Sequence, residues 1–330
     1  MEILLQILPT IRIASMSISL QKKDQFLGIS LAVLATMIWA GNFVISKGVS
    51  QLISPITLAF FRWTLASIII IPIAWSSYKK EKQYIKENIR YLFWVSLSGI
   101  ALFNTCIYVS GHFTSAINMA LIGTTSSPIF ATIFAVIFLK EKISASRLIG
   151  LILCIIGILI LLSKGSFEKL LLLRFGIGDL WILAAGFCFA VYSVLVRKKP
   201  PTISSLHFLM LIFSMGAIML FPFFLIENWY LPKPQFTPAL IGSILYLGFG
   251  TSVIAFLCWN IALHKLGTSR TVLFGNLTPI FSTLEAVLIL GEKFSSVHIL
   301  SGLLVISGLV IANLKTATAF KKKSSTEISK

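Results

Sequence analysis

PIFATIFAVIFLKEK, residues 128–142, returns later in the chain as PIFSTLEAVLILGEK, residues 279–293. Nine of the fifteen aligned positions are identical, and the two copies are offset by 151 residues. The same offset pairs Tyr108 with Trp259, well outside the repeated stretch. A period of this length in a chain of 330 residues is too long for a solenoid, so it indicates two copies of one large unit.

The composition indicates what each copy is. The chain is 57% hydrophobic and only 12% charged, with a mean hydropathy of +0.93, far from the balance of a soluble domain. A bilayer core of roughly 30 Å needs about 20 apolar helical residues to cross it, and apolar runs recur from residue 26 onward. The sequence therefore predicts an integral membrane protein.

The fold class that we predict is an all-α integral membrane protein, with ten transmembrane helices as two inverted five-helix repeats. The fifth and tenth spans are the shortest, and a buried helix of soluble type is the alternative for them. The predicted spans cover residues 26–46, 53–75, 91–111, 116–139, 147–163, 178–196, 206–226, 238–263, 268–290 and 297–314.

These spans divide the chain into five parts. Residues 1–25 are predicted to be an uncleaved cytoplasmic tail rather than a targeting signal, because Pro9 interrupts the apolar part and no clear cleavage site follows. A start at Met16 is left open. Residues 26–163 form the first repeat, 164–177 a linker, 178–314 the second repeat and 315–330 a basic cytoplasmic tail.

Lysine and arginine set the predicted orientation. With the N-terminus inside, most of the 28 basic residues fall in cytoplasmic segments, so both termini are predicted to lie in the cytoplasm. The predicted location is the inner (cytoplasmic) membrane of the cell. The basic residues are scattered over short loops, so the net charge of +17 does not indicate nucleic acid as a partner. Those expected outside are Lys47, Lys164, Lys169, Arg174, Lys233 and Lys293.

An odd number of spans per copy has a geometric consequence. The second copy must enter the membrane from the opposite side, so the halves are inverted. Inverted repeats are an architecture by which transporters alternate access to a site near the bilayer midplane. We therefore predict a secondary transporter rather than an enzyme, with a non-transporting scaffold or receptor as the alternative.

Several stretches also resemble a known family. They are IWAGNFVISK from Ile38, PITLAFFRWTLA from Pro55, GDLWILAAGFCFAVYSVLVRK from Gly178 and the two repeated segments, residues 128–142 and 279–293. Together they look like the EamA-type family of the drug/metabolite transporter superfamily. The resemblance implies a ten-helix permease that often exports amino acids or other small metabolites. It leaves the substrate open, and import of nucleotide-type or other metabolites stays an alternative.

Polar residues on one face of two related helices are candidates for a substrate cavity. Asn118, Thr125 and Pro128 share a face of the fourth span, and Asn276 and Pro279 repeat the last two positions in the ninth. Such side chains avoid lipid and face protein or water. The prolines are the expected weak points of their helices, and hydrogen bonding between helices is the alternative role for the polar groups.

Aromatic residues supply the second candidate set. Trp39, Tyr108, Tyr192 and Trp259 could stack on an organic substrate or hold a cation, although packing and membrane-interface belts explain most such residues. For Trp39, Tyr108 and Trp259, the family resemblance strengthens a pocket role. Beside them, Asn42 and Asn260 are expected to hydrogen-bond a carboxylate or an amide.

Two charged residues lie within predicted spans. Arg62 is expected to have a structural role, tying its helix to backbone carbonyls or to an interfacial acid, because an arginine in the membrane needs partners. Glu285, whose repeat mate is Phe134, is the candidate for proton coupling; a structural acid near the outer leaflet is the alternative.

The remaining residues predict neither a cofactor nor a metal site. The four cysteines lie within spans without close pairs, and the four histidines form no ligand cluster. The expected partners are a small-molecule substrate and the lipid bilayer, and a homodimer is left open. The predicted mechanism is rocking of the two inverted halves around a midplane pocket that holds an amino acid or a similar solute.

Overall fold

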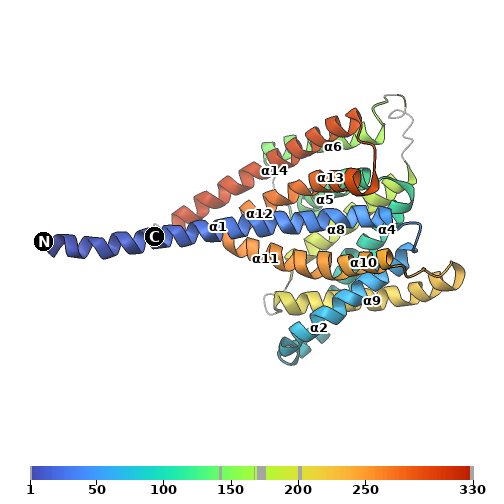
Figure 1. The fold of residues 1–330 in the computed structure, drawn as a ribbon, viewed down its shortest axis with the longest axis horizontal. Coiled ribbons are helices and arrows are strands. Elements are labelled where there is room, and N and C mark those ends of the chain that lie inside the picture. Colours follow the sequence, from blue (N-terminus) through green and yellow to red (C-terminus); the bar gives the residue numbers. More distant parts are fainter. Residues whose placement is uncertain (1, 141–142, 167, 169–175, 200–202, 328–330) are drawn as a thin grey trace.

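The computed structural model describes residues 2–140, 143–166, 168, 176–199 and 203–327, and this part of the chain is helical without a β-strand. Figure 1 shows long helices packed side by side, with the N-terminal part of α1 projecting from one end. Helices suit this environment because a lipid-exposed backbone must satisfy its own hydrogen bonds.

The first half contains α1 (Glu2–Gly48), α2 (Pro55–Glu87), α3 (Ile89–Ser96), α4 (Phe103–Phe113), α5 (Ala116–Leu139) and α6 (Ala145–Leu162). Helices α3 and α4 form one span, joined by a π-helical segment, Leu97–Leu102. Helix α1 is continuous from Glu2, so the segment predicted as a tail is helical and runs directly into the first span.

The second half contains α8 (Ile177–Arg197), α9 (Ser205–Tyr230), α10 (Pro238–Leu245), α11 (Ala255–Leu266), α12 (Thr268–Phe274), α13 (Thr278–Leu290) and α14 (Ser296–Glu327). A second π-helical segment, Tyr246–Ile254, joins α10 to α11. A 3₁₀ turn, Gly275–Leu277, joins α12 to α13. The predicted linker lies mostly outside the described residues.

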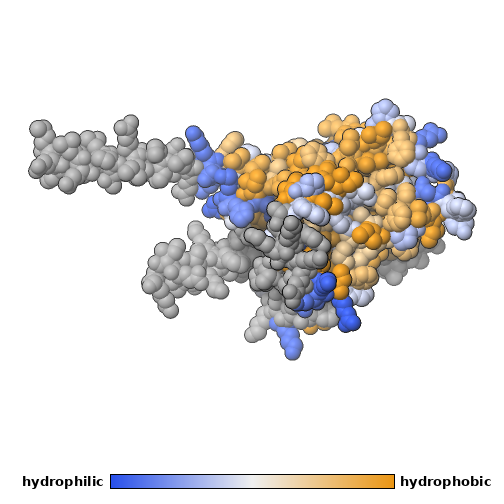
Figure 2. Space-filling view, turned by 90° about the horizontal axis from the view of Figure 1, so that it is seen from below, coloured by the Kyte–Doolittle hydropathy of each residue, from blue (hydrophilic) through white to orange (hydrophobic). Residues whose placement is uncertain are grey.

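Within the described ranges, nine helical stretches are long and apolar enough to cross a bilayer. They correspond to the first nine predicted spans. The tenth prediction falls on Ser296–Ala312 of α14, which is apolar but shorter. Figure 2 shows the matching surface, with apolar side chains over the body of the molecule and hydrophilic ones toward its ends.

The packing of α6 against α14 shows how the halves are related. The thiol of Cys154 lies 3.6 Å from the carbonyl oxygen of Val305, its own repeat mate at a separation of 151 residues. Residues that contact their own mates lie on the symmetry axis. Nearby, Gly150 meets Gly308 and Gly157 meets Ser301, so the two helices run antiparallel. The pseudo-two-fold axis therefore crosses the helices, and the predicted inversion of the halves is confirmed.

The same symmetry governs the rest of the packing. Helix α1 packs on α11 and α13 of the other half, just as α8 packs on α4 and α5. The π-helical segments also correspond, because an offset of 151 carries Leu97–Leu102 onto residues within Tyr246–Ile254. π-Helical turns are rare and concentrate at functional sites. Their occurrence at matched positions in both halves directs attention to what lies beside them.

Candidate functional site

Arg62 of α2 is a buried cation in the middle of a span, with only 6% of its surface exposed. Its Nη1 donates to Asn42 Oδ1 at 2.8 Å, to Asn104 Oδ1 at 2.7 Å and to the Tyr108 hydroxyl at 2.8 Å. Its Nε donates to the Ser252 hydroxyl at 3.1 Å. These five residues form what we name the Arg62 cluster.

The cluster joins both halves of the molecule. Asn104 and Tyr108 lie one helical turn apart on α4, directly after the first π-helical segment. Ser252 lies inside the second π-helical segment, and its hydroxyl donates at 3.0 Å to the carbonyl of Leu247, five residues earlier. The span that contains the first π-helical segment and the second π-helical segment itself therefore both contribute polar side chains to one guanidinium.

The partners of Arg62 are all neutral. Among the described residues, none of the carboxylates lies within ion-pair distance of the guanidinium. The guanidinium carbon also lies 4.7 Å from the centre of the Trp63 ring. The expected partners, backbone carbonyls or an acid, are replaced by side-chain amides and hydroxyls. The site thus holds a positive charge that no described acid offsets.

A tryptophan pair lies beside this cluster. The rings of Trp39 and Trp259, from opposite halves, are tilted with centroids 5.2 Å apart. Trp39 Nε1 donates at 3.0 Å to the carbonyl of Thr251, the residue before Ser252. Trp39, Asn42 and Tyr108, which were chosen as candidates from the sequence, thus surround the same π-helical segment as Arg62.

Other predicted cavity residues lie outside this cluster. Asn118 donates to Thr114 Oγ1 at 3.3 Å near the start of α5, and its buried Oδ1 has no partner. Asn260 donates to Phe256 O of its own helix at 3.0 Å. Asn276 is buried in the 3₁₀ turn before α13, and its Nδ2 is also without a partner.

Thr125 has a local hydrogen bond, whereas Tyr192 contacts the other half. The Thr125 hydroxyl donates to Leu121 O one turn earlier at 2.6 Å. Tyr192 of α8 packs against Gly99 of the first π-helical segment so closely that a Cβ atom at Gly99 would overlap the ring. Tyr192 therefore supports the backbone of this segment from the opposite half, in contact with the span that carries Asn104 and Tyr108.

The two proline positions differ. Helix α5 runs unbroken through Pro128, whereas the 3₁₀ turn interrupts the ninth span just before Pro279. The threonines four residues on, Thr132 and Thr283, each donate to the proline carbonyl at 2.8 Å. Back-bonding of this kind bends helices. The role of the prolines as weak points stays a prediction.

Glu285 lies on α13, away from the hydrogen bonds of the Arg62 cluster. Its side chain is half-buried and interacts electrostatically with Tyr246 at the start of the second π-helical segment. Tyr246 in turn donates to Ile38 O at 2.9 Å. A role in proton coupling stays a prediction.

Asn104 and Ser252 are the cluster residues that the sequence did not indicate. Asn104 could have been found, because it precedes Tyr108 by four residues and shares its helix face. Ser252 carries no such signal. Cys106 of α4 and Cys188 of α8 are free thiols that lie close to each other across the halves, although they are far apart in the sequence. Sequence spacing does not reveal contacts between halves.

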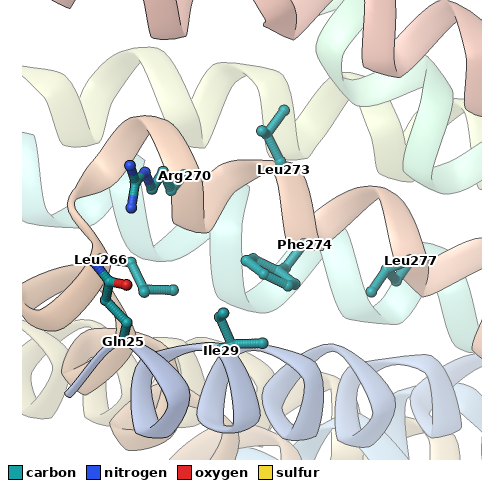
Figure 3. A pocket seen from close by; sticks show the side chains of 7 residues that line it. All are labelled: Gln25, Ile29, Leu266, Arg270, Leu273, Phe274 and Leu277. Carbon is teal, nitrogen blue, oxygen red and sulfur yellow. The ribbon is translucent and has the colours of Figure 1, made fainter. Parts of the chain in front are cut away.

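A groove opens at the end of the bundle that carries the N-terminus. It has a volume of about 370 Å³ and lies between α1 and the α11–α12 corner. Figure 3 shows Gln25 and Ile29 of α1 facing Leu266 and Phe274 of the other half. Its remaining lining residues are Arg270, Leu273 and Leu277. None of the predicted cavity residues lines this groove.

No group of histidine, cysteine, aspartate or glutamate residues suited to a metal ion occurs in the described part of the chain. The chemistry of the cluster is therefore that of hydrogen bonding, aromatic contact and one positive charge.

Comparison with known proteins identifies the family. The model of the EamA-like transporter family matches residues 26–163 and again residues 176–314. The chain belongs to the EamA-like transporter family. As in the sequence pattern, two copies of the family's domain follow one another, and they account for nearly all of the described spans.

Relatives and a solved structure agree with this membership. The chain is 29% identical over 292 residues to the uncharacterized transporter YyaM of Bacillus subtilis, covering 87% of this chain and 94% of that one. It is 22% identical over 299 residues to a probable amino-acid metabolite efflux pump of Salmonella typhimurium, covering 88% and 95%. A crystal structure at 16% identity superposes with a TM-score of 0.59 over 90% of this chain and 99% of the other, which supports the fold.

This EamA-like protein is thus a multi-pass membrane transporter built from two inverted repeats, as the sequence predicts. The Arg62 cluster and the adjoining tryptophan pair are its candidate substrate site, because both join the two halves at matched π-helical segments.

Proposed function

We propose that this EamA-like transporter exports an amino acid or a similar small metabolite across the cytoplasmic membrane by alternating access. The observation that carries the proposal is the position of the Arg62 cluster between the halves. Rocking of one half against the other would move Ser252 relative to Arg62 and expose the cluster to each side in turn.

The charge of Arg62 favours a substrate with a carboxylate. A buried guanidinium with only neutral partners is costly in a membrane, and a carboxylate can accept two of its hydrogen bonds at once. The Trp39–Trp259 pair offers an apolar surface next to that charge for the remainder of the solute. The Salmonella relative is named a probable amino-acid metabolite efflux pump, which agrees with this choice.

We place both termini in the cytoplasm. The distribution of lysine and arginine among the loops supports this orientation, which puts the groove near Gln25 and Arg270 on the cytoplasmic side. A groove between the halves on that side suits the entry of a solute that is to be exported. The proton-coupling role of Glu285 belongs to the same proposal.

The first test measures solute efflux in cells that express the protein, loaded with a panel of dipeptides that release amino acids and with nucleosides. We expect expression to raise efflux of at least one amino acid. Trp259→Ala should reduce that efflux about two- to tenfold at equal protein level, since loss of an aromatic contact removes about 0.5–1.5 kcal/mol of interaction.

The matched control is Trp229→Ala, because Trp229 is 83% exposed and lies far from the tryptophan pair in sequence. Efflux equal to that of the native protein is expected for this variant. Nucleoside efflux without amino-acid efflux would contradict the substrate class, and uptake of the same amino acid would reverse the proposed direction.

A further inference from the structure

Three carboxylates of the second half bind the first half at one end of the bundle. They belong to Asp179, Glu227 and Glu292, and their partners lie at the starts of α2 and α5 and just after α4. Figure 1 shows these helix ends opposite the projecting N-terminus. In the proposed orientation, this is the extracellular end.

Glu227, near the end of α9, caps the first turn of α2. Its Oε1 accepts from the backbone N–H of Ile56 at 3.2 Å, and its Oε2 accepts from the N–H and the hydroxyl of Thr57 at 2.6 and 2.8 Å. Asn228 adds a 2.8 Å hydrogen bond to the same hydroxyl, and Thr57 is fully buried. Glu227 and Asn228 are themselves half-buried, so the contact is a multiply hydrogen-bonded joint between the halves.

Glu292 repeats this geometry at α5. Its Oε1 accepts from the N–H of Ala116 at 2.7 Å, and its Oε2 accepts from the N–H of Ile117 at 3.1 Å. The αL conformation of Gly291, with φ of 65°, ends α13 just before this glutamate. Glu292 corresponds by repeat to Glu141, which lies outside the described residues.

Asp179 supports the same joint. The Thr114 hydroxyl donates to its Oδ1 at 3.0 Å, and the neighbouring Ser110 hydroxyl donates to Gly178 O at 2.8 Å. Both donors belong to the first half, and both acceptors belong to the second.

The origin of these caps is unusual. The first N–H groups of a helix lack partners within it, and the preceding residues ordinarily supply a cap. Here each cap is a glutamate carboxylate from the other half of the molecule, and it accepts hydrogen bonds from two backbone N–H groups of the helix. Charge-assisted hydrogen bonds at the positive end of a helix dipole are among the stronger polar contacts. Separation of the halves at this end must break both caps together.

We propose that Glu227 and Glu292 are latches that hold the extracellular end closed and set how often it opens. This proposal rests on the proposed function in two respects. The orientation proposed there makes this end extracellular, and alternating access requires this end to open. Breaking a latch removes the carboxylate from two backbone N–H groups at the start of a helix, so the charge-assisted hydrogen bonds of the cap are lost. Each latch therefore favours the closed conformation of this end.

The test is chemical accessibility, which needs no substrate. In a variant without the four native cysteines, Asn118→Cys places a thiol directly after the two residues that Glu292 binds. A membrane-impermeant maleimide is added to right-side-out and to inside-out vesicles, and the labelling rate is measured. A second probe, Thr125→Cys, lies two turns deeper on the same face.

We expect Glu227→Gln and Glu292→Gln each to raise labelling in right-side-out vesicles about fivefold or more, as expected for a coupling of this kind. Glu292→Asp, which keeps the charge on a shorter side chain, should give an intermediate rate. Glu168→Gln is the control, because Glu168 is exposed and carries the same charge. Size-exclusion chromatography confirms that each variant is folded.

Unchanged labelling in the Glu227→Gln/Glu292→Gln double variant would overturn the proposal. An equal increase in Glu168→Gln would also overturn it, since charge removal alone would then loosen the protein. An increase confined to inside-out vesicles would support the latches and contradict the proposed orientation, so the two claims fail separately.

Discussion

Replacing Arg62 with glutamine is expected to reduce transport more than a hundredfold at equal protein level. Glutamine still hydrogen-bonds but lacks the charge, so a substrate carboxylate would lose its counterion in a site of low dielectric. The guanidinium also donates hydrogen bonds to Asn42, Asn104 and Tyr108 at the same time. The measurement is the initial rate of efflux of whichever solute the wild-type protein exports.

A lysine at the same position separates charge from structure. Lysine keeps the cation but lacks the planar fork that reaches several partners, so we expect Arg62→Lys to retain part of the transport. Both variants should lower thermal stability, because each buried acceptor that loses its donor costs about 1–3 kcal/mol. Equal loss of transport in both variants, with equal loss of stability, would reduce Arg62 to a structural role. Arg90→Gln, at an exposed position, is the control.

The second large effect concerns the symmetry axis. Gly308→Ala is expected to destabilise the protein strongly, because its Cβ would lie 2.5 Å from Gly150 O and 2.8 Å from Cys154 Sγ. Backbone atoms cannot rotate away, so α6 and α14 would have to separate. Overpacking of this kind costs about 1–3 kcal/mol, occasionally more. In a membrane, helix association depends on such close packing of small residues.

Gly302→Ala is the matched control on the same helix. A Cβ at Gly302 would meet only Leu121 Cδ2 at 3.9 Å, which is an ordinary contact distance. Thermal unfolding followed by fluorescence-detected chromatography compares the two single-methyl variants. A lower unfolding temperature for Gly308→Ala alone supports the antiparallel crossing, and equal unfolding temperatures would contradict it.

Much of the fold follows from the sequence because it depends on composition and repetition. Apolar runs predict spans, and an odd number of spans per repeat predicts inversion. The offset that aligns the two EK segments is also the separation of Cys154 and Val305, which meet at the axis. The helical continuation of the first span back to Glu2 was not predicted in this form, and the cytoplasmic location of residues 1–25 stays a prediction.

The site was predictable only in part. Trp39, Asn42, Arg62 and Tyr108 were identified because each is unusual for its position in a span. Ser252 was not, because a π-helical turn holds more residues than an α-helical one. Extrapolating a period of 3.6 through Tyr246–Ile254 therefore assigns its residues to the wrong face.

The 3₁₀ turn before Pro279 likewise interrupts the helical period at Asn276, whose place in the cavity stays a prediction. The latch glutamates were missed for a different reason. Glu227 and Glu292 lie at helix ends, where an acid ordinarily faces water. Their partners are backbone N–H groups, which no residue type in the sequence indicates.

The central claim is that a solute bearing a carboxylate crosses this EamA-like transporter at the Arg62 cluster. Counterflow in proteoliposomes containing the purified protein tests it most directly. Vesicles are loaded with an unlabelled amino acid, and entry of the same labelled amino acid is followed with its methyl ester or its amide as competitor. We predict rapid exchange that the free acid inhibits and the ester and amide do not. Inhibition by the ester as strong as by the acid would contradict the claim.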